Sequence, residues 1–86
     1  MEIRYSKSSL KFLAKLDKQS ADRILNGIKG LILSPPQGDI KLMKGYSDGR
    51  KRLRVGSFRV IYRIDTDNKI EVLCILDIGN RGDIYK

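Results

Sequence analysis

Apolar and cationic side chains alternate along residues 50–63, on both sides of Gly56-Ser57. Alternation with a period of two places successive side chains on opposite faces of a β-strand. The pattern therefore predicts a hairpin of two strands that turns at Gly56-Ser57. One face carries Lys51 and the apolar row Leu53, Val55, Phe58, Val60, Tyr62 and Ile64, and the other carries Arg50, Arg52, Arg54, Arg59 and Arg63. Such a hairpin can bury one face in a core and present guanidinium groups on the other.

Two helices are expected before the hairpin. The first follows the N-cap candidates Ser6, Ser8 and Ser9 and carries Leu10, Leu13 and Ala14 at helical spacing. Asp17 caps a longer second helix, whose apolar stripe is Ala21, Ile24, Leu25, Ile28, Leu31 and Ile32. Ser34-Pro35-Pro36 is predicted to end this helix, because proline lacks an amide donor and restricts the residue before it.

The remaining segments predict strands and a connector. Residues 1–5 alternate weakly and indicate an opening strand, and residues 35–49, with three glycines, indicate an ordered connector. After a turn at 65–69, the apolar run 70–78 is expected to be a central strand covered on both faces, with a last short strand at Ile84-Tyr85. Residues 1–86 thus form a single α+β domain, in which a helical hairpin packs on one side of a small, largely antiparallel sheet.

Charge narrows the choice of partner. The 86 residues include 18 Lys and Arg against 10 Asp and Glu, a formal net charge of +8. This balance favours nucleic acid, ribosomes or an acidic protein as partner. No apolar run approaches the roughly 18 residues that span a bilayer, and the N-terminus does not resemble a signal peptide, so no membrane association and a cytoplasmic location are expected.

The chain contains no histidine and a single cysteine. The absence of histidine excludes histidine-based acid–base pairs, nucleophiles activated by histidine and most zinc sites. Catalysis would have to use arginine, lysine, tyrosine or carboxylates. The single cysteine, Cys74, lies within an apolar run and is expected to be a packed core thiol, with no intramolecular disulfide.

The arginine face of the hairpin is the candidate functional surface. Guanidinium groups suit phosphate, although a solvated, charged outer face would show the same pattern. Arg81 follows the apolar strand, and Tyr85 lies four residues later, within possible reach of Arg52 and Arg59. A concave basic surface with a tyrosine would bind RNA through phosphate contacts and base stacking.

Two segments resemble the RelE/ParE toxin superfamily of bacterial and archaeal toxin–antitoxin systems. Residues 52–63 read Arg-Leu-Arg-Val-Gly-Ser-Phe-Arg-Val-Ile-Tyr-Arg, and residues 78–85 read Ile-Gly-Asn-Arg-Gly-Asp-Ile-Tyr. The second segment favours the RelE branch. The resemblance covers essentially the whole chain and implies a toxin that cleaves mRNA in the ribosomal A site. Cleavage would proceed without metal or cofactor, by attack of the 2′-hydroxyl on the adjacent phosphate.

The resemblance also implies roles for individual residues. Arg81 would protonate the leaving oxygen and Tyr85 would orient or stack on a base, while Arg52 and Arg59 would complete the catalytic set. RNA binding would fall to Arg50, Arg54, Arg63 and Lys44. Arg50 and Arg52 stand where family members often carry lysines, and arginine is a poor general base because it stays protonated. The base is unassigned, since Lys51 is predicted on the core side and Lys41 and Lys44 have no predicted place.

Two other functions are compatible with the sequence. A ParE-like protein with the same fold would poison DNA gyrase, and a catalytically silent basic module would bind RNA or ribosomes without cutting. As a toxin, the chain would also need an acidic, RelB-like antitoxin that folds as it binds, in a complex such as a heterotetramer.

Overall fold

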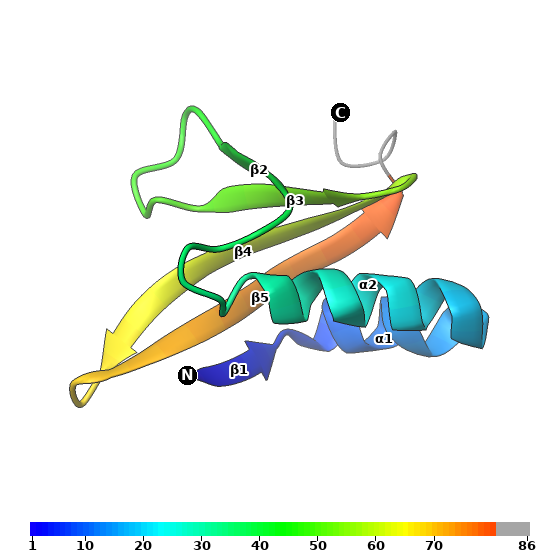
Figure 1. Cartoon of the computed structure of the whole chain (residues 1–86), viewed down its shortest axis with the longest axis horizontal. Helices are drawn as coiled ribbons and strands as arrows, with labels where there is room; N and C mark the ends of the chain where they lie inside the picture. The colour runs from blue at the N-terminus through cyan, green and yellow to red at the C-terminus, as the bar shows by residue number, and fades with distance from the viewer. Residues whose placement is uncertain (81–86) are drawn as a thin grey trace.

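The computed structural model describes residues 1–80 and has one mixed sheet with two helices (Figure 1). In chain order the elements are β1 (Glu2–Tyr5), α1 (Lys7–Lys15), α2 (Lys18–Gly30), β2 (Asp39–Leu42), β3 (Lys51–Val55), β4 (Phe58–Asp67) and β5 (Ile70–Asn80). The five strands lie in the order β1-β5-β4-β3-β2. All neighbours are antiparallel except β1, which runs parallel to β5. The expected α+β class is confirmed.

The β3–β4 hairpin has the predicted register. Leu53 pairs with Val60, and Arg54 pairs with Arg59, so apolar and cationic residues occupy opposite faces. Gly56 turns the chain with φ 58°, a left-handed conformation that favours glycine. β4 continues to Asp67, and the turn to β5 is confined to Asn68 and Lys69, both with positive φ, rather than beginning at Asp65 as expected.

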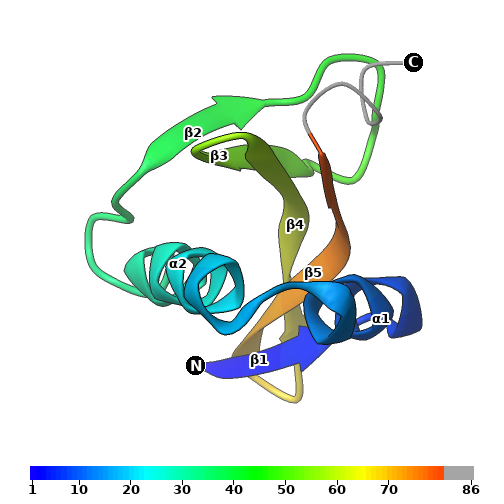
Figure 2. The same cartoon turned by 90° about the vertical axis from the view of Figure 1, so that its right-hand side faces the viewer.

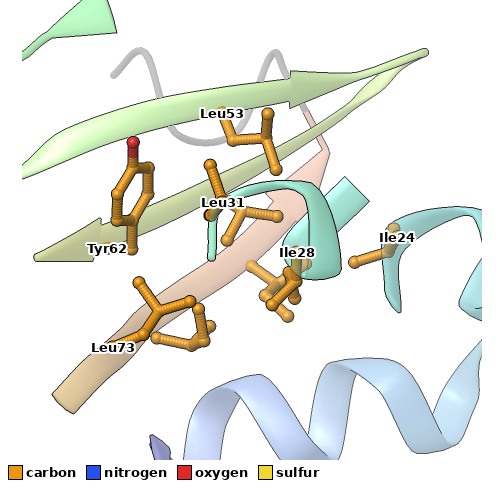
Figure 3. Close-up of a cluster of buried hydrophobic side chains, with 9 residues drawn as sticks. Ile24, Ile28, Leu31, Leu53, Tyr62 and Leu73 are labelled. Atoms are coloured by element: carbon orange, nitrogen blue, oxygen red, sulfur yellow. The ribbon is translucent and has the colours of Figure 1, made fainter. Parts of the chain in front are cut away.

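α2 covers one face of the sheet and supplies the centre of the core (Figures 2 and 3). The fully buried apolar side chains come from α2, its C-cap residue and the strands β3, β4 and β5; they are Ile24, Ile28, Leu31, Leu53, Val60, Leu73 and Ile75. The predicted stripe is therefore confirmed at its centre. The helix ends at Gly30 rather than beside Ser34. The amides of Leu31, Ile32 and Leu33 donate to the carbonyls three residues earlier, as in a 3₁₀ turn, and the Gln37 amide donates to the Gly30 carbonyl. Ile32 is consequently exposed.

α1 begins at the Ser6 cap, whose side chain accepts a hydrogen bond from the Ser9 amide at 3.1 Å. The Ser6 hydroxyl also donates to the Leu76 carbonyl at 2.8 Å, which fixes the helix against β5. This anchor turns buried Ser9 and the side chains of Phe12, Leu13 and Leu16 inward. Leu10 and Ala14 are exposed, so the expectation that they form the inner stripe is wrong. Neither described helix is long and apolar enough to cross a bilayer.

The expected connector contains an edge strand, β2, which pairs antiparallel with β3. Ile40 lies opposite Leu53 and packs against the core, while Lys41 lies opposite Arg52 on the other face. The alternation Asp39-Ile40-Lys41-Leu42 is the sequence signal for this strand, shortened to four residues. β2 thereby extends the face that carries Arg52 by one strand.

β5 is a central strand, as expected, because it lies between β1 and β4 in the sheet. Its register with β4 shifts by one residue: Ile61 pairs with Asp77, whereas the next residue, Tyr62, pairs with Ile75. Leu76 is therefore the extra residue of a β-bulge. On the outer face Cys74 is half-buried beside Arg63, with its thiol 3.6 Å from an Asp65 carboxylate oxygen. Cys74 is therefore not a core thiol, and burial is the main cause that raises its pKa.

Candidate nucleic-acid interface

The outer face of the sheet, opposite α2, carries the arginines of β3 and β4. Figure 2 shows this face bordered by α1 on one side and by the segment between β2 and β3 on the other. The pairing of Lys41 with Arg52, and of Arg54 with Arg59, places cations from three neighbouring strands on this face. The sheet thus brings together cations that lie up to 18 residues apart in the chain, from Lys41 to Arg59.

A pocket of about 260 Å³ gathers four of these cations and is called here the cationic pocket. It is lined by Lys41, Leu42, Met43, Lys44, Arg52 and Arg59. The exposed fractions of Arg52 and Arg59 are only 7% and 2%, so both guanidinium groups are held within the structure. Arg52 and Arg59 lie on one face, as expected, and the pocket also brings Lys44, which had no predicted place, beside them. Lys41 was not among the predicted site residues.

Asp39 on β2 orients two arginines of β3. The Arg52 Nη2 donates to its Oδ1 at 3.4 Å, and the Arg54 Nε lies 3.7 Å from its Oδ2. The Nε of Arg52 is buried without a hydrogen-bond acceptor among residues 1–80, which costs free energy. Arg52 is therefore a constrained cation, fixed by packing and by one partly exposed carboxylate.

Arg50 and Arg63 both form ion pairs with a second carboxylate, that of Asp48. The Arg50 Nη2 lies 2.7 Å from the Asp48 Oδ2, and the Arg63 Nη1 lies 3.1 Å from the same oxygen. Arg63 also donates to Asp65 at 3.1 Å. Hydrogen bonds from Arg50 are the main cause that holds the pKa of the Asp48 carboxyl well below its usual range.

These ion pairs correct the expectation of a uniform guanidinium plate. Arg50, Arg54 and Arg63 each pair with an acidic residue, and Arg52 is buried rather than exposed. The acids come from β2, from the segment between β2 and β3, and from β4, and folding brings them onto the outer face. Net positive charge is consequently concentrated in the cationic pocket.

A second, larger pocket of about 690 Å³ lies beside the first and is called here the aromatic pocket. Its walls come from α1, from the segment between β2 and β3, and from the centre of the sheet. They include Phe12, Met43, Tyr46, Arg50, Ile61 and Asp77. The Arg50 guanidinium carbon lies 4.3 Å from the centroid of the Tyr46 ring, in cation–π geometry. Tyr46 keeps about half of its surface exposed, at 49%.

The other predicted site residues have different outcomes. Arg81 and Tyr85 lie outside the described residues, so their roles stay predictions. Lys51 shares the face of its partner Tyr62, as predicted, but it is exposed and stands away from both pockets. Among residues 1–80, no group of three or more His, Cys, Asp or Glu side chains is placed to hold a metal ion.

Sequence reasoning missed Lys41, Asp39, Asp48 and Tyr46. The alternation of residues 39–42 was the available signal for the first two, because it places Asp39 and Lys41 on one face of a strand. No periodic pattern marks Asp48 or Tyr46, which lie in an irregular segment and reach the site only through tertiary contacts.

Comparison with known proteins identifies the family. Residues 3–85 match the model of the ParE toxin of type II toxin–antitoxin systems, parDE. Comparison with curated protein sequences gave no significant match. Among solved structures, the archaeal RelE of a RelE–RelB complex from Pyrococcus horikoshii OT3 is 29% identical, with 94% of each chain covered and a TM-score of 0.72. The RelB–RelE complex from Methanococcus jannaschii contains a chain 25% identical, with 94% of this chain and 93% of that chain covered and a TM-score of 0.65.

The YoeB/ParE toxin from Agrobacterium tumefaciens shares the fold at 20% identity, with 93% of this chain and 98% of that chain covered and a TM-score of 0.76. The superfamily resemblance drawn from the two sequence segments is therefore confirmed. Since the family model spans nearly the entire chain, this protein belongs to the ParE toxin family of type II toxin–antitoxin systems.

Proposed function

We propose that this toxin is a ribosome-dependent, metal-independent endoribonuclease that cleaves mRNA in the ribosomal A site and thereby inhibits translation in the cytoplasm. The observation that carries the proposal is the cationic pocket. Lys41, Lys44, Arg52 and Arg59 converge there, and the described lining includes no carboxylate. A pocket with this charge suits the phosphodiester of a polynucleotide.

The proposed reaction is an in-line displacement at phosphorus. The 2′-oxygen attacks the adjacent phosphorus, the bond to the 5′-oxygen breaks, and the products are a cyclic phosphate and a 5′-hydroxyl. Negative charge gathers on the non-bridging oxygens in the transition state, and fixed cations stabilise that charge. Arg52 and Arg59 are suited to this role because they are buried and constrained.

The two protons of the reaction need separate carriers. The resemblance to RelE assigns protonation of the leaving oxygen to Arg81 and contact with a base to Tyr85. The ribosome would hold the 2′-oxygen, the phosphorus and the leaving oxygen in line, which supplies much of the rate acceleration. The base that accepts the 2′-hydroxyl proton has no assignment, and Lys41 and Lys44 are the lysines in the pocket to be tested for it.

The remaining cations divide into two groups. Within residues 1–80, Arg54 has Asp39 as its one ion-pair partner, and it would contact the RNA backbone. Arg50 and Arg63 share Asp48, so they would contribute less net charge to RNA binding than their number suggests. This division refines the equal RNA-binding roles expected from the sequence.

The deciding experiment adds the purified protein to mRNA with and without translating ribosomes and maps new 5′ ends by primer extension. We expect cuts within codons only on ribosomes, and undiminished cuts when preassembled complexes are treated with EDTA. Arg52→Gln should slow cleavage by about 100- to 1,000-fold, as expected for loss of one preorganised group. Arg4→Gln removes the same charge from an exposed site on β1 and should cleave normally. Cleavage that is equally fast in both variants would refute the role of the pocket.

The match to the ParE model favours a second candidate, inhibition of DNA gyrase. Strand breaks in DNA trapped by gyrase, together with intact mRNA on ribosomes, would establish it. Tight binding to ribosomes with neither cleavage nor gyrase-dependent breaks would instead support the non-cleaving module.

We also propose that an acidic, RelB-like antitoxin segment neutralises the toxin by folding over the basic outer face, in a complex such as a heterotetramer. The similar archaeal structures are complexes of RelE with RelB. Charge reversal at Arg54 and Lys44, two cations of this face, should weaken antitoxin binding strongly. Unchanged affinity after both reversals would exclude neutralisation by charge.

A further inference from the structure

We propose that the aromatic pocket is a nucleobase subsite, which stacks the base of a nucleotide next to the phosphate held in the cationic pocket. This inference rests on the proposed function, since it takes RNA as the ligand of the outer face. It concerns Tyr46 and Arg50, which are distinct from Tyr85, the residue that the resemblance associates with base contact.

The first argument is the preorganised stacking surface. Asp48 accepts two hydrogen bonds from the Arg50 side chain, from Nε at 3.1 Å and from Nη2 at 2.7 Å, which fixes the plane of the guanidinium group. That group lies 4.3 Å from the centroid of the Tyr46 ring. Asp48 is itself tied to β4 through Arg63. The Arg50 guanidinium plane is therefore held in place beside the Tyr46 ring, and Tyr46 is 49% exposed, which leaves surface for a base to stack on.

The second argument is the difference in chemistry between the two pockets. The cationic pocket suits a phosphate, whereas the aromatic pocket is lined mainly by apolar and aromatic groups such as Phe12, Met43 and Ile61. Asp77 adds an acceptor whose position is fixed, because its Oδ1 accepts from the Ile78 amide at 3.1 Å and lies 3.4 Å from the Ser8 hydroxyl. An apolar slot with one fixed acceptor matches a base that presents an amino group and repels a phosphate.

The third argument is that the two pockets adjoin. Met43 lines both of them. Along β4, Arg59 lines the cationic pocket and Ile61, two residues on and thus on the same face, lines the aromatic pocket. One polynucleotide can therefore place a phosphate against Arg59 and the neighbouring base against Tyr46.

The test measures binding and cleavage separately. For binding, a 2′-O-methyl pentanucleotide, which cannot be cleaved by attack of the 2′-oxygen, is titrated into the toxin and followed by NMR, with intact RNA and with each base in turn removed. Removal of one particular base should weaken binding to the wild type by roughly 5- to 150-fold, the range for one stacked base. Tyr46→Ala should weaken binding of intact RNA by a similar factor and should cause no further loss with the RNA that lacks that base.

Two variants serve as controls. Tyr46→Phe keeps the ring and should bind as the wild type does. Ile70→Ala truncates an exposed apolar side chain at the start of β5, beside the turn that joins it to β4, and should also bind normally. Because Tyr46 and Ile70 are both exposed, neither change should alter the thermal unfolding temperature.

Equal losses from Tyr46→Ala on intact and base-deleted RNA, or no loss at all, would overturn the inference, as would the absence of any RNA binding. Loss of antitoxin binding in Tyr46→Ala with RNA binding unchanged would also overturn it, by assigning the pocket to a protein partner. Tyr46-dependent stacking in a toxin that cuts no mRNA on ribosomes would support the subsite and refute the cleavage proposal alone.

Discussion

Replacement of Gly27 by alanine has two opposing effects on the free energy of unfolding: a gain in helix propensity and a steric clash between α2 and β3. An added Cβ would lie 2.8 Å from the Val55 Cγ2 and 3.4 Å from the Leu53 Cδ2. Helix propensity alone would stabilise the protein by about 1 kcal/mol, because glycine is a poor residue inside a helix. Overpacking against a β-branched side chain costs about 1–3 kcal/mol. The net expectation is a loss of up to about 2 kcal/mol in the free energy of unfolding.

Urea titration followed by far-UV circular dichroism measures this change, since the chain has no tryptophan. In a Val55→Ala background the nearest clashing carbon is removed, and Gly27→Ala should then be neutral or stabilising by up to about 1 kcal/mol. Asn26→Ala, at an exposed position of the same helix, should be mildly stabilising and controls for propensity. Stabilisation by Gly27→Ala in the wild-type background would refute the close approach of α2 to the strand that carries Arg52.

Three further outcomes concern charged residues of the outer face. Asp39→Asn should tighten RNA binding and steepen its salt dependence, because Arg52 loses its carboxylate partner, while the stability measured in urea falls by less than about 1 kcal/mol. Lys44→Arg should retain cleavage on ribosomes if Lys44 supplies charge alone, whereas loss of cleavage in Lys44→Arg and Lys44→Met alike would assign it a proton-transfer role. The depressed pKa of Asp48 contributes stability that is fully present above its unfolded value near 3.8 and is lost as pH falls toward the folded value. Stability should therefore fall less steeply below pH 4 in Asp48→Asn than in the wild type, and parallel curves would contradict that contribution.

The sequence was most informative where structure depends on local periodicity. Alternation on either side of Gly56 predicted the faces of β3 and β4, and the apolar spacing of residues 21–31 predicted the buried side of α2. It was less informative where orientation depends on distant contacts. The rotation of α1 follows from the bond between Ser6 and the Leu76 carbonyl, and the outward position of Cys74 follows from its register with β4.

The same limit applies to the candidate site. The alternation predicted that Arg52 and Arg59 share a face, and the structure brings both to one pocket with Lys44, whose place was not predicted. Their different environments were not predictable, because the acids that pair with the other arginines come from separate elements. Asp48 meets Arg63 across 15 positions of the chain, and no periodic signal encodes that contact.

The parallel pairing of β1 with β5 has a consequence for how the protein forms during synthesis. Residues 2–5 pair with residues 72–75, which are made 70 positions later. Until β5 has left the ribosome, β1 has no strand to join and the apolar residues of β4 lack their neighbour on that side. The sheet, and the aromatic pocket that β5 helps to line, therefore cannot be completed before β5 has emerged from the ribosome.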